Sequence, residues 1–187
     1  MKKIYIRCLG LILIGVFGFI NHSGGIYSSN TGNINFFSHT SVEDISADNH
    51  KVKSAFDATS GKIQFSLLIK DFEFKKALMQ EHFNENYLES TKFPKAKFNG
   101  NISNVSAIDF SKNGKYSSPV SGKLTIKDVS KTVNTIATFT VNGGVVNGKA
   151  SFKVNPEDYN IEIPKLVVNK ISKDIKISID VDFRHKH

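Results

Sequence analysis

The sequence has no tryptophan and only one cysteine, Cys8, among its 187 residues. Cys8 lies in an N-terminal segment that resembles a leader, so we expect the processed chain to have no disulfide and no thiol chemistry. Stability must then come from an apolar core. A chain of about 160 residues suits one domain and can bury roughly two thirds of its unfolded surface.

Arginine is almost as scarce, because Arg184 is the only arginine after Arg7. The formal net charge of +8 comes mainly from isolated lysines with aspartate and glutamate between them. Nucleic-acid binding typically requires clustered basic residues interleaved with exposed aromatic residues. We therefore expect no nucleic-acid partner. The lysines are interpreted as a solubilising shell, with transient contact at an anionic membrane surface as the alternative.

Common catalytic and metal-binding motifs are also missing: there is no G-x-S-x-G, H-E-x-x-H, C-x-x-C or G-x-x-x-x-G-K-[ST]. His82, about one helical turn from Glu85, comes nearest to a metal or acid/base site. A lone histidine beside an apolar stripe is usually packed or bonded to a neighbour. We therefore predict that the protein is not an enzyme and has no catalytic residue and no metal ligand. The lesser alternative is an enzyme with its site in the His82 region.

The N-terminus has the pattern of a secretory signal. Lys2, Lys3 and Arg7 precede an apolar run over residues 9–20, which is shorter than the roughly 20 residues of a membrane-spanning helix. We expect residues 1–25 to be a signal peptide and residues 26–187 to form one periplasmic or secreted domain. An uncleaved anchor is the alternative.

Strict alternation of apolar and polar residues predicts β-strands with one buried face. The clearest case is residues 174–183, DIKISIDVDF. Asn142, Gly143 and Gly144 mark a tight hairpin between two strands. The strands are expected over residues 33–40, 51–58, 62–70, 95–103, 122–127, 133–141, 145–154 and 174–183.

About eight strands with short turns indicate an all-β protein, as either a closed antiparallel barrel or a sandwich. An eight-stranded barrel holds side chains or one small ligand. The expected inward faces mix small residues with large ones. Small residues such as Gly100, Gly122 and Gly148 either leave room for a chain-like ligand or accommodate the bulk of aromatic neighbours.

Residues 71–98 interrupt the strands. Within them, residues 75–88 carry Leu78, Met79, Phe83 and Tyr87 at helical spacing, which predicts an amphipathic helix that covers one end of the barrel. Pro94 ends this segment before the next strand.

The segment over residues 71–98 carries Met79, His82, Phe83, Leu88, Pro94 and Phe98, and residues 122–133 have the sequence GKLTIKDVSKTV. Both stretches resemble the YceI-like family of lipocalin-like secreted proteins. The insert resembles the family pattern M-x-x-H-F/L-x-x-x-x-F/L-x-x-x-x-x-P followed by a strand ending in Phe. The later stretch GKLTIKDVSKTV resembles G-x-L-T-I-x-G-V-T-K-x-V, with Asp128, Ser130 and Thr132 departing from it. The similarity covers about residues 32–183. The matching residues are Met79, His82, Phe83, Leu88, Pro94, Phe98, Gly122, Leu124, Thr125, Ile126, Val129, Lys131 and Val133.

The resemblance implies a lipocalin-like eight-stranded antiparallel barrel whose tunnel binds a polyisoprenoid or similar apolar lipid. The hypothesis is extracytoplasmic carriage of such a lipid, for example an isoprenoid or a quinone, with no other cofactor. A ligand-free stress-response or protein-interaction module acting through its surface is the alternative. The residues expected to bind the lipid are Phe65, Leu67, Leu78, Met79, Phe83, Phe98, Ile102, Leu124, Ile126, Phe139, Phe152, Ile177 and Ile179.

Overall fold

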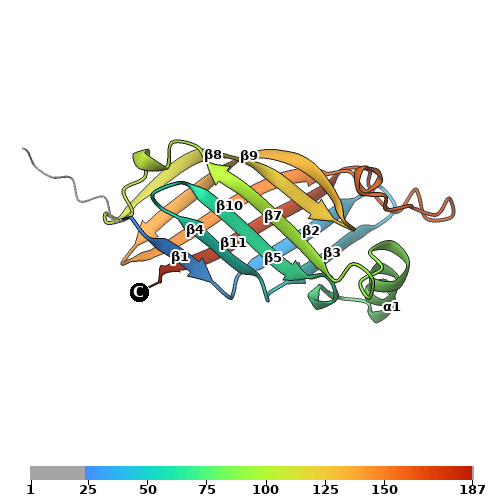
Figure 1. Cartoon of the computed structure of the whole chain (residues 1–187). Helices are drawn as coiled ribbons and strands as arrows, with labels where there is room; N and C mark the ends of the chain where they lie inside the picture. The colour runs from blue at the N-terminus through green and yellow to red at the C-terminus, as the bar shows by residue number, and fades with distance from the viewer. Residues whose placement is uncertain (1–23, 187) are drawn as a thin grey trace, which may run out of the picture.

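The structure, a computed structural model, describes residues 24–186. Cys8 and nearly all of the expected signal peptide lie outside these residues. Figure 1 shows long strands wound into one barrel, with α1 at one end. The strands are β1 (Ile26–Ser29), β2 (Asn33–His39), β3 (Asp44–Asn49), β4 (Lys53–Asp57), β5 (Lys62–Leu68), β6 (Glu73–Phe74), β7 (Lys95–Ile102), β8 (Gly114–Ile126), β9 (Val129–Asn142), β10 (Val145–Val154) and β11 (Ile175–His185).

Eight of these strands form a closed ring in the order β1, β4, β5, β7, β8, β9, β10 and β11. The ring closes where Tyr27 and Ser28 of β1 pair with His185 and Arg184 of β11. Every paired strand runs antiparallel to its neighbour. β2, β3 and β6 extend the wall beside the first half of β11. The predicted fold, an eight-stranded antiparallel barrel with a short helix at one end, is confirmed.

The strictly alternating strands lie close to their expected positions, whereas less regular ones differ. β8 begins at Gly114 rather than at Gly122, and neither β1 nor β3 was expected. The hairpin between β9 and β10 is confirmed. Gly143 and Gly144 have φ angles of +55° and +80°, a region that glycine enters without steric cost.

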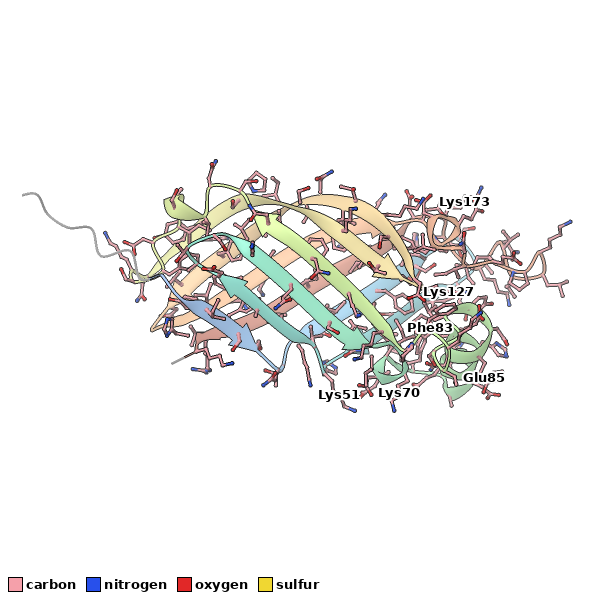
Figure 2. The ribbon with its side chains drawn as sticks, viewed as in Figure 1. Lys51, Lys70, Phe83, Glu85, Lys127 and Lys173 are labelled. Atoms are coloured by element: carbon pink, nitrogen blue, oxygen red, sulfur yellow. The ribbon has the colours of Figure 1, made fainter. Side chains whose placement is uncertain are left out.

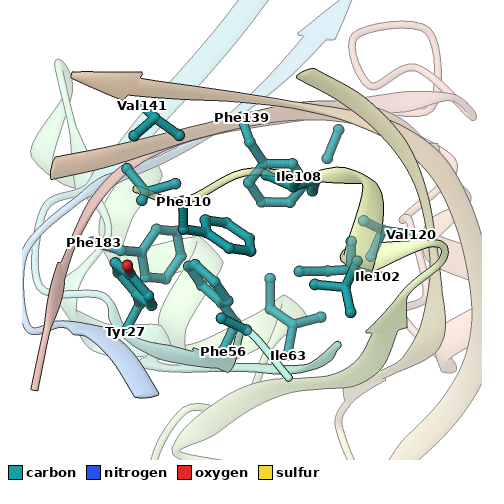
Figure 3. Packing of buried hydrophobic residues seen from close by; sticks show 14 of the residues in the cluster. Tyr27, Phe56, Ile63, Ile102, Ile108, Phe110, Val120, Phe139, Val141 and Phe183 are labelled. Carbon is teal, nitrogen blue, oxygen red and sulfur yellow. The ribbon is translucent and has the colours of Figure 1, made fainter. Parts of the chain in front are cut away.

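One end of the barrel is filled by its own side chains (Figure 3). The ring of Phe56 lies 5.0 Å from those of Tyr27 and Phe183 and 5.3 Å from that of Phe110. Phe110 and Ile108 come from the chain between β7 and β8, and both are buried. At about 1.5 to 3 kcal/mol for each large apolar side chain removed from water, this cluster stabilises the barrel and closes that end.

Two glycines make room for one phenylalanine. Gly100 and Gly122 pair across β7 and β8. A Cβ atom at either position would lie 2.6 Å from the ring of Phe98, which no real contact tolerates. These glycines therefore accommodate an aromatic neighbour, the second of the two interpretations of small inward residues.

The predicted helix lies at the other end of the barrel. It comprises α1 (Ala77–His82) and a π-helical turn, η2 (Phe83–Tyr87). The Leu88 amide donates to the Phe83 carbonyl five residues earlier, at 2.9 Å. We refer to residues 77–88 as the helical cover. Within residues 24–186, no helix has both the length and the hydropathy that a bilayer span requires.

Candidate functional site

An apolar cavity of about 550 Å³ occupies the part of the barrel nearest the helical cover. Its volume lies in the range of about 300 to 1,000 Å³ that is usual for small-molecule sites. Inward-facing residues of β2, β5, β7, β8, β9, β10 and β11 line it, together with the helical cover and the chain that follows β10. We call the end where these last two segments meet the mouth.

Strand periodicity explains why the walls are apolar. Along β11, Ile175, Ile177 and Ile179 line the cavity, whereas Lys176 and Ser178 between them do not. Phe65 and Leu67 of β5 repeat this pattern. Because side chains alternate between the two faces of a strand, a sequence of period two gives a dry interior and a polar exterior.

The helical cover is held to one side of the mouth by an aromatic cluster. The ring centroid of Phe83 lies 5.4 Å from Phe36, 5.6 Å from Phe72 and 5.0 Å from Phe74. Stacked and edge-on pairs at these separations stabilise a contact beyond the area that they bury. Phe36 also lines the cavity, so the cluster is continuous with its wall.

Two ion pairs attach the cover to hairpin turns. Lys127 Nζ, in the turn between β8 and β9, lies 2.5 Å from Glu89 Oε1. Lys76 Nζ, just before α1, lies 2.9 Å from Glu43 Oε1 in the turn between β2 and β3. The hydrogen bond and positive charge of Lys127 lower the pKa of the Glu89 carboxyl group. Figure 2 labels Lys127 in the β8–β9 turn, above the helical cover.

The chain between β10 and β11 forms another side of the mouth. It starts with a short 3-10 helix, η4 (Pro156–Tyr159), whose tyrosine is buried against the cavity. Burial, together with the charge of Asp158, raises the pKa of Tyr159 to about 12. Near β11, the Ser172 amide donates to Ser38 Oγ at 2.8 Å. The base of this segment is therefore fixed to the barrel at both ends.

All but one of the predicted lipid-binding residues line this cavity. Ile102 is the exception, because it is buried in the cluster that fills the closed end. Leu78 lies at the mouth and is largely exposed, although it belongs to the apolar stripe that the helical cover was expected to bury against the barrel. The residues on the cavity wall are Phe65, Leu67, Leu78, Met79, Phe83, Phe98, Leu124, Ile126, Phe139, Phe152, Ile177 and Ile179.

Several wall residues were not predicted. Ile34 and Phe36 alternate within an expected strand, a signal that was available in the sequence. Phe72, Tyr159 and Ile163 also line the cavity, but they lie in irregular segments where no periodicity marks a face.

His82 ends α1 with an exposed side chain and lies at the cavity mouth. In the described part of the chain, no group of three or more histidine, cysteine, aspartate or glutamate residues is arranged to hold a metal ion.

Comparison with known proteins agrees with this barrel fold. The model of the YceI-like domain matches residues 17–183. The chain belongs to the YceI-like family. No curated protein matches the sequence.

Solved structures share the fold of this YceI-like protein at low sequence identity. A polyisoprenoid-binding domain from Saccharophagus degradans, implicated in plant cell wall breakdown, has a TM-score of 0.75 at 11% identity, over 87% of this chain and 99% of that one. Burkholderia cenocepacia BcnA has a TM-score of 0.67 at 17% identity, over 81% and 95%. A Campylobacter jejuni YceI protein has a TM-score of 0.63 at 17% identity, over 80% and 90%.

Proposed function

We propose that this protein carries or stores a long apolar lipid outside the cytoplasm, and that a polyisoprenoid chain occupies the barrel cavity. The apolar cavity, closed at one end and open beside the helical cover, is the observation that carries the proposal. The name of the Saccharophagus degradans neighbour supports the choice of lipid. The signal-like N-terminal sequence supports the location.

The energetics suit binding of an apolar chain in the apolar cavity. Burial of apolar groups gives about 0.8 kcal/mol per CH₂, so one five-carbon isoprene unit contributes roughly 3 to 4 kcal/mol. Association costs about 4 to 15 kcal/mol. A few buried units are then enough for stable binding without any charged or covalent anchor. The function is binding, and no residue is assigned a catalytic role.

A series of prenols of increasing length tests the proposal. We expect affinity to rise with each added isoprene unit from geraniol to farnesol and geranylgeraniol, and to reach a plateau when the cavity is full. The measurement is competition with a fluorescent apolar probe in detergent-free buffer. Saturated alcohols of matched carbon number report how far the cavity selects the prenyl shape. Absence of saturable binding at every length would reject the proposal and favour the surface-interaction alternative.

A further inference from the structure

The mouth of the cavity is ringed by apolar side chains that face solvent. Leu166 is 92% exposed, Leu78 61%, Val42 55% and Val168 52%. They lie on three segments that meet at this end of the barrel: the β10–β11 connection, α1 and the β2–β3 turn (Figure 1). Only two other large apolar residues in the described part of the chain, Ile26 and Ile136, are comparably exposed. A folded protein rarely gathers such residues around one opening without a partner.

The β10–β11 connection has a fixed base and a projecting tip. Its base is held by buried Tyr159 and Ile161 and by the bond from Ser172 to Ser38. Residues 164–170 form the tip, which Figure 1 shows extending beyond the barrel. Turns within the tip are closed by backbone bonds from Val167 to Pro164 and from Lys170 to Val167.

The tip is apolar on two sides. Val167 faces the cavity mouth, whereas its neighbours Leu166 and Val168 face outward. The outer apolar surface is therefore continuous with the cavity wall. A lipid chain leaving the cavity would pass along this surface, which avoids exposure of its hydrocarbon to water.

Lysines flank the outward-facing residues. Lys165 and Lys173 are exposed and form no ion pair with another described residue, and neither does Lys75 beside α1. Figure 2 labels Lys173 at this end of the barrel. Exposed apolar residues with adjacent lysines match the interface of a bilayer, where apolar groups enter the acyl boundary and cations meet anionic head groups.

We propose that the mouth docks on the surface of an anionic lipid bilayer, with Leu166 and Val168 entering the interface. This inference rests on the proposed function, because docking places the open end of the lipid cavity against the membrane. Lysines at the rim favour a bilayer over a protein partner, since protein interfaces are depleted in lysine.

Vesicle flotation tests the docking, using the protein as the exporting cell processes it. Vesicles of phosphatidylcholine are compared with vesicles that contain phosphatidylglycerol. The test variant is Leu166→Ser with Val168→Ser, neither of which lines the cavity. Ile136→Ser is the matched control, because Ile136 on the outer face of β9 is 61% exposed, between the 52% of Val168 and the 92% of Leu166. Lys165→Gln with Lys173→Gln tests the charge.

We expect binding to anionic vesicles to fall about tenfold in the double serine variant, from loss of apolar insertion, and to be unchanged in Ile136→Ser. The lysine variant should lose the preference for phosphatidylglycerol. Equal binding by wild type and the double serine variant, or no binding, would overturn the inference. So would a dimer, seen by sedimentation, that is lost in the double serine variant.

A second measurement separates this inference from the proposed function. Binding of geranylgeraniol from buffer should be equal in wild type and in the double serine variant, because the cavity is intact. If wild type binds vesicles as expected but does not bind geranylgeraniol, docking stands and the carrier function fails. If geranylgeraniol binds but docking fails, the lipid reaches the cavity by another route.

Discussion

At the scale of single residues, the β8–β9 turn carries conformational strain. Asp128 has a φ angle of +59°. In this region the backbone of a residue with a Cβ atom is strained by about 1 to 2 kcal/mol. Glycine removes this strain but also increases the conformational entropy of the unfolded chain, which offsets part of the gain in stability. We expect Asp128→Gly to raise the free energy of unfolding by about 0.5 to 1 kcal/mol, as measured by urea denaturation.

Gly143→Ala, in the β9–β10 turn, provides the reverse substitution as a control for Asp128→Gly. Gly143 also has a positive φ angle, and a Cβ there would meet no atom within 4 Å. The substitution should therefore destabilise the protein through backbone strain alone, by about 1 kcal/mol. A loss of stability in Asp128→Gly would contradict the account and would indicate that the Asp128 side chain stabilises the turn.

Burial of Tyr159 makes the stability of the barrel depend on pH in the alkaline range. Its folded-state pKa is about 12, against an ordinary value of 10.0. Above pH 10 the unfolded chain loses this proton while the folded chain keeps it, so the free energy of unfolding falls between about pH 10 and 12. Tyr159→Phe should show a shallower fall over this window in urea denaturation. An unchanged slope would mean that Tyr159 ionises as freely in the folded protein as in the unfolded chain.

At the scale of elements, the helical cover depends on its attachments. The lowered pKa of Glu89 means that its pairing with Lys127 stabilises the folded state above the ordinary glutamate pKa of 4.5 and is lost as pH falls through the folded-state value. We expect Glu89→Gln to speed amide hydrogen exchange in residues 83–88 at neutral pH, with little change in the barrel strands. In wild type, acidification below the folded-state pKa of Glu89 should lower the protection factors of residues 83–88, which are corrected for the intrinsic exchange rate at each pH.

Glu85→Gln is the control for the cover. Glu85 is exposed on the same turn, and it forms no ion pair with another described residue. Exchange in residues 83–88 should therefore stay as in wild type. Equal acceleration in both variants would show that the ion pair does not hold the cover.

The elements that the sequence failed to predict share a physical cause. The first half of β8 contains Ser117, Ser118 and Pro119, which oppose a strand assignment. Pro119 fits there because the β7 ladder ends at Val120, and the Pro119 carbonyl accepts from Ser103 instead. In β3 the buried Asn49 donates its side-chain amide to the Leu68 carbonyl at 3.0 Å. In both cases the hydrogen bonds are made with residues distant in the sequence, which a local sequence pattern does not reveal.

At the scale of the whole molecule, the wall residues were predictable because alternation fixes which side of a strand they occupy. The closure of the strands into a barrel was not predictable from alternation, because it depends on the pairing of β1 with β11, which lie at opposite ends of the described chain. The cover and the β10–β11 connection add wall residues that no strand pattern reveals. The choice of barrel came from family resemblance, and the structure agrees with it.

Cavity volume should control lipid binding. Ala150 lines the cavity on β10, next to Ser151 on the outer face. We expect Ala150→Phe to weaken geranylgeraniol binding at least about tenfold, because the added ring occupies the space of the ligand. Ser151→Phe should bind as wild type does. The measurement is displacement of a fluorescent apolar probe, and equal affinities in the two variants would place the ligand outside the barrel.

The most direct test of the central claim is native mass spectrometry of the protein purified, without detergent, from the cells that produce it, followed by extraction and identification of any lipid. We predict a stoichiometric adduct whose mass series is spaced by isoprene units, reduced in Ala150→Phe and retained in Ser151→Phe. A ligand-free mass that persists after incubation with prenols would contradict a lipid-binding barrel.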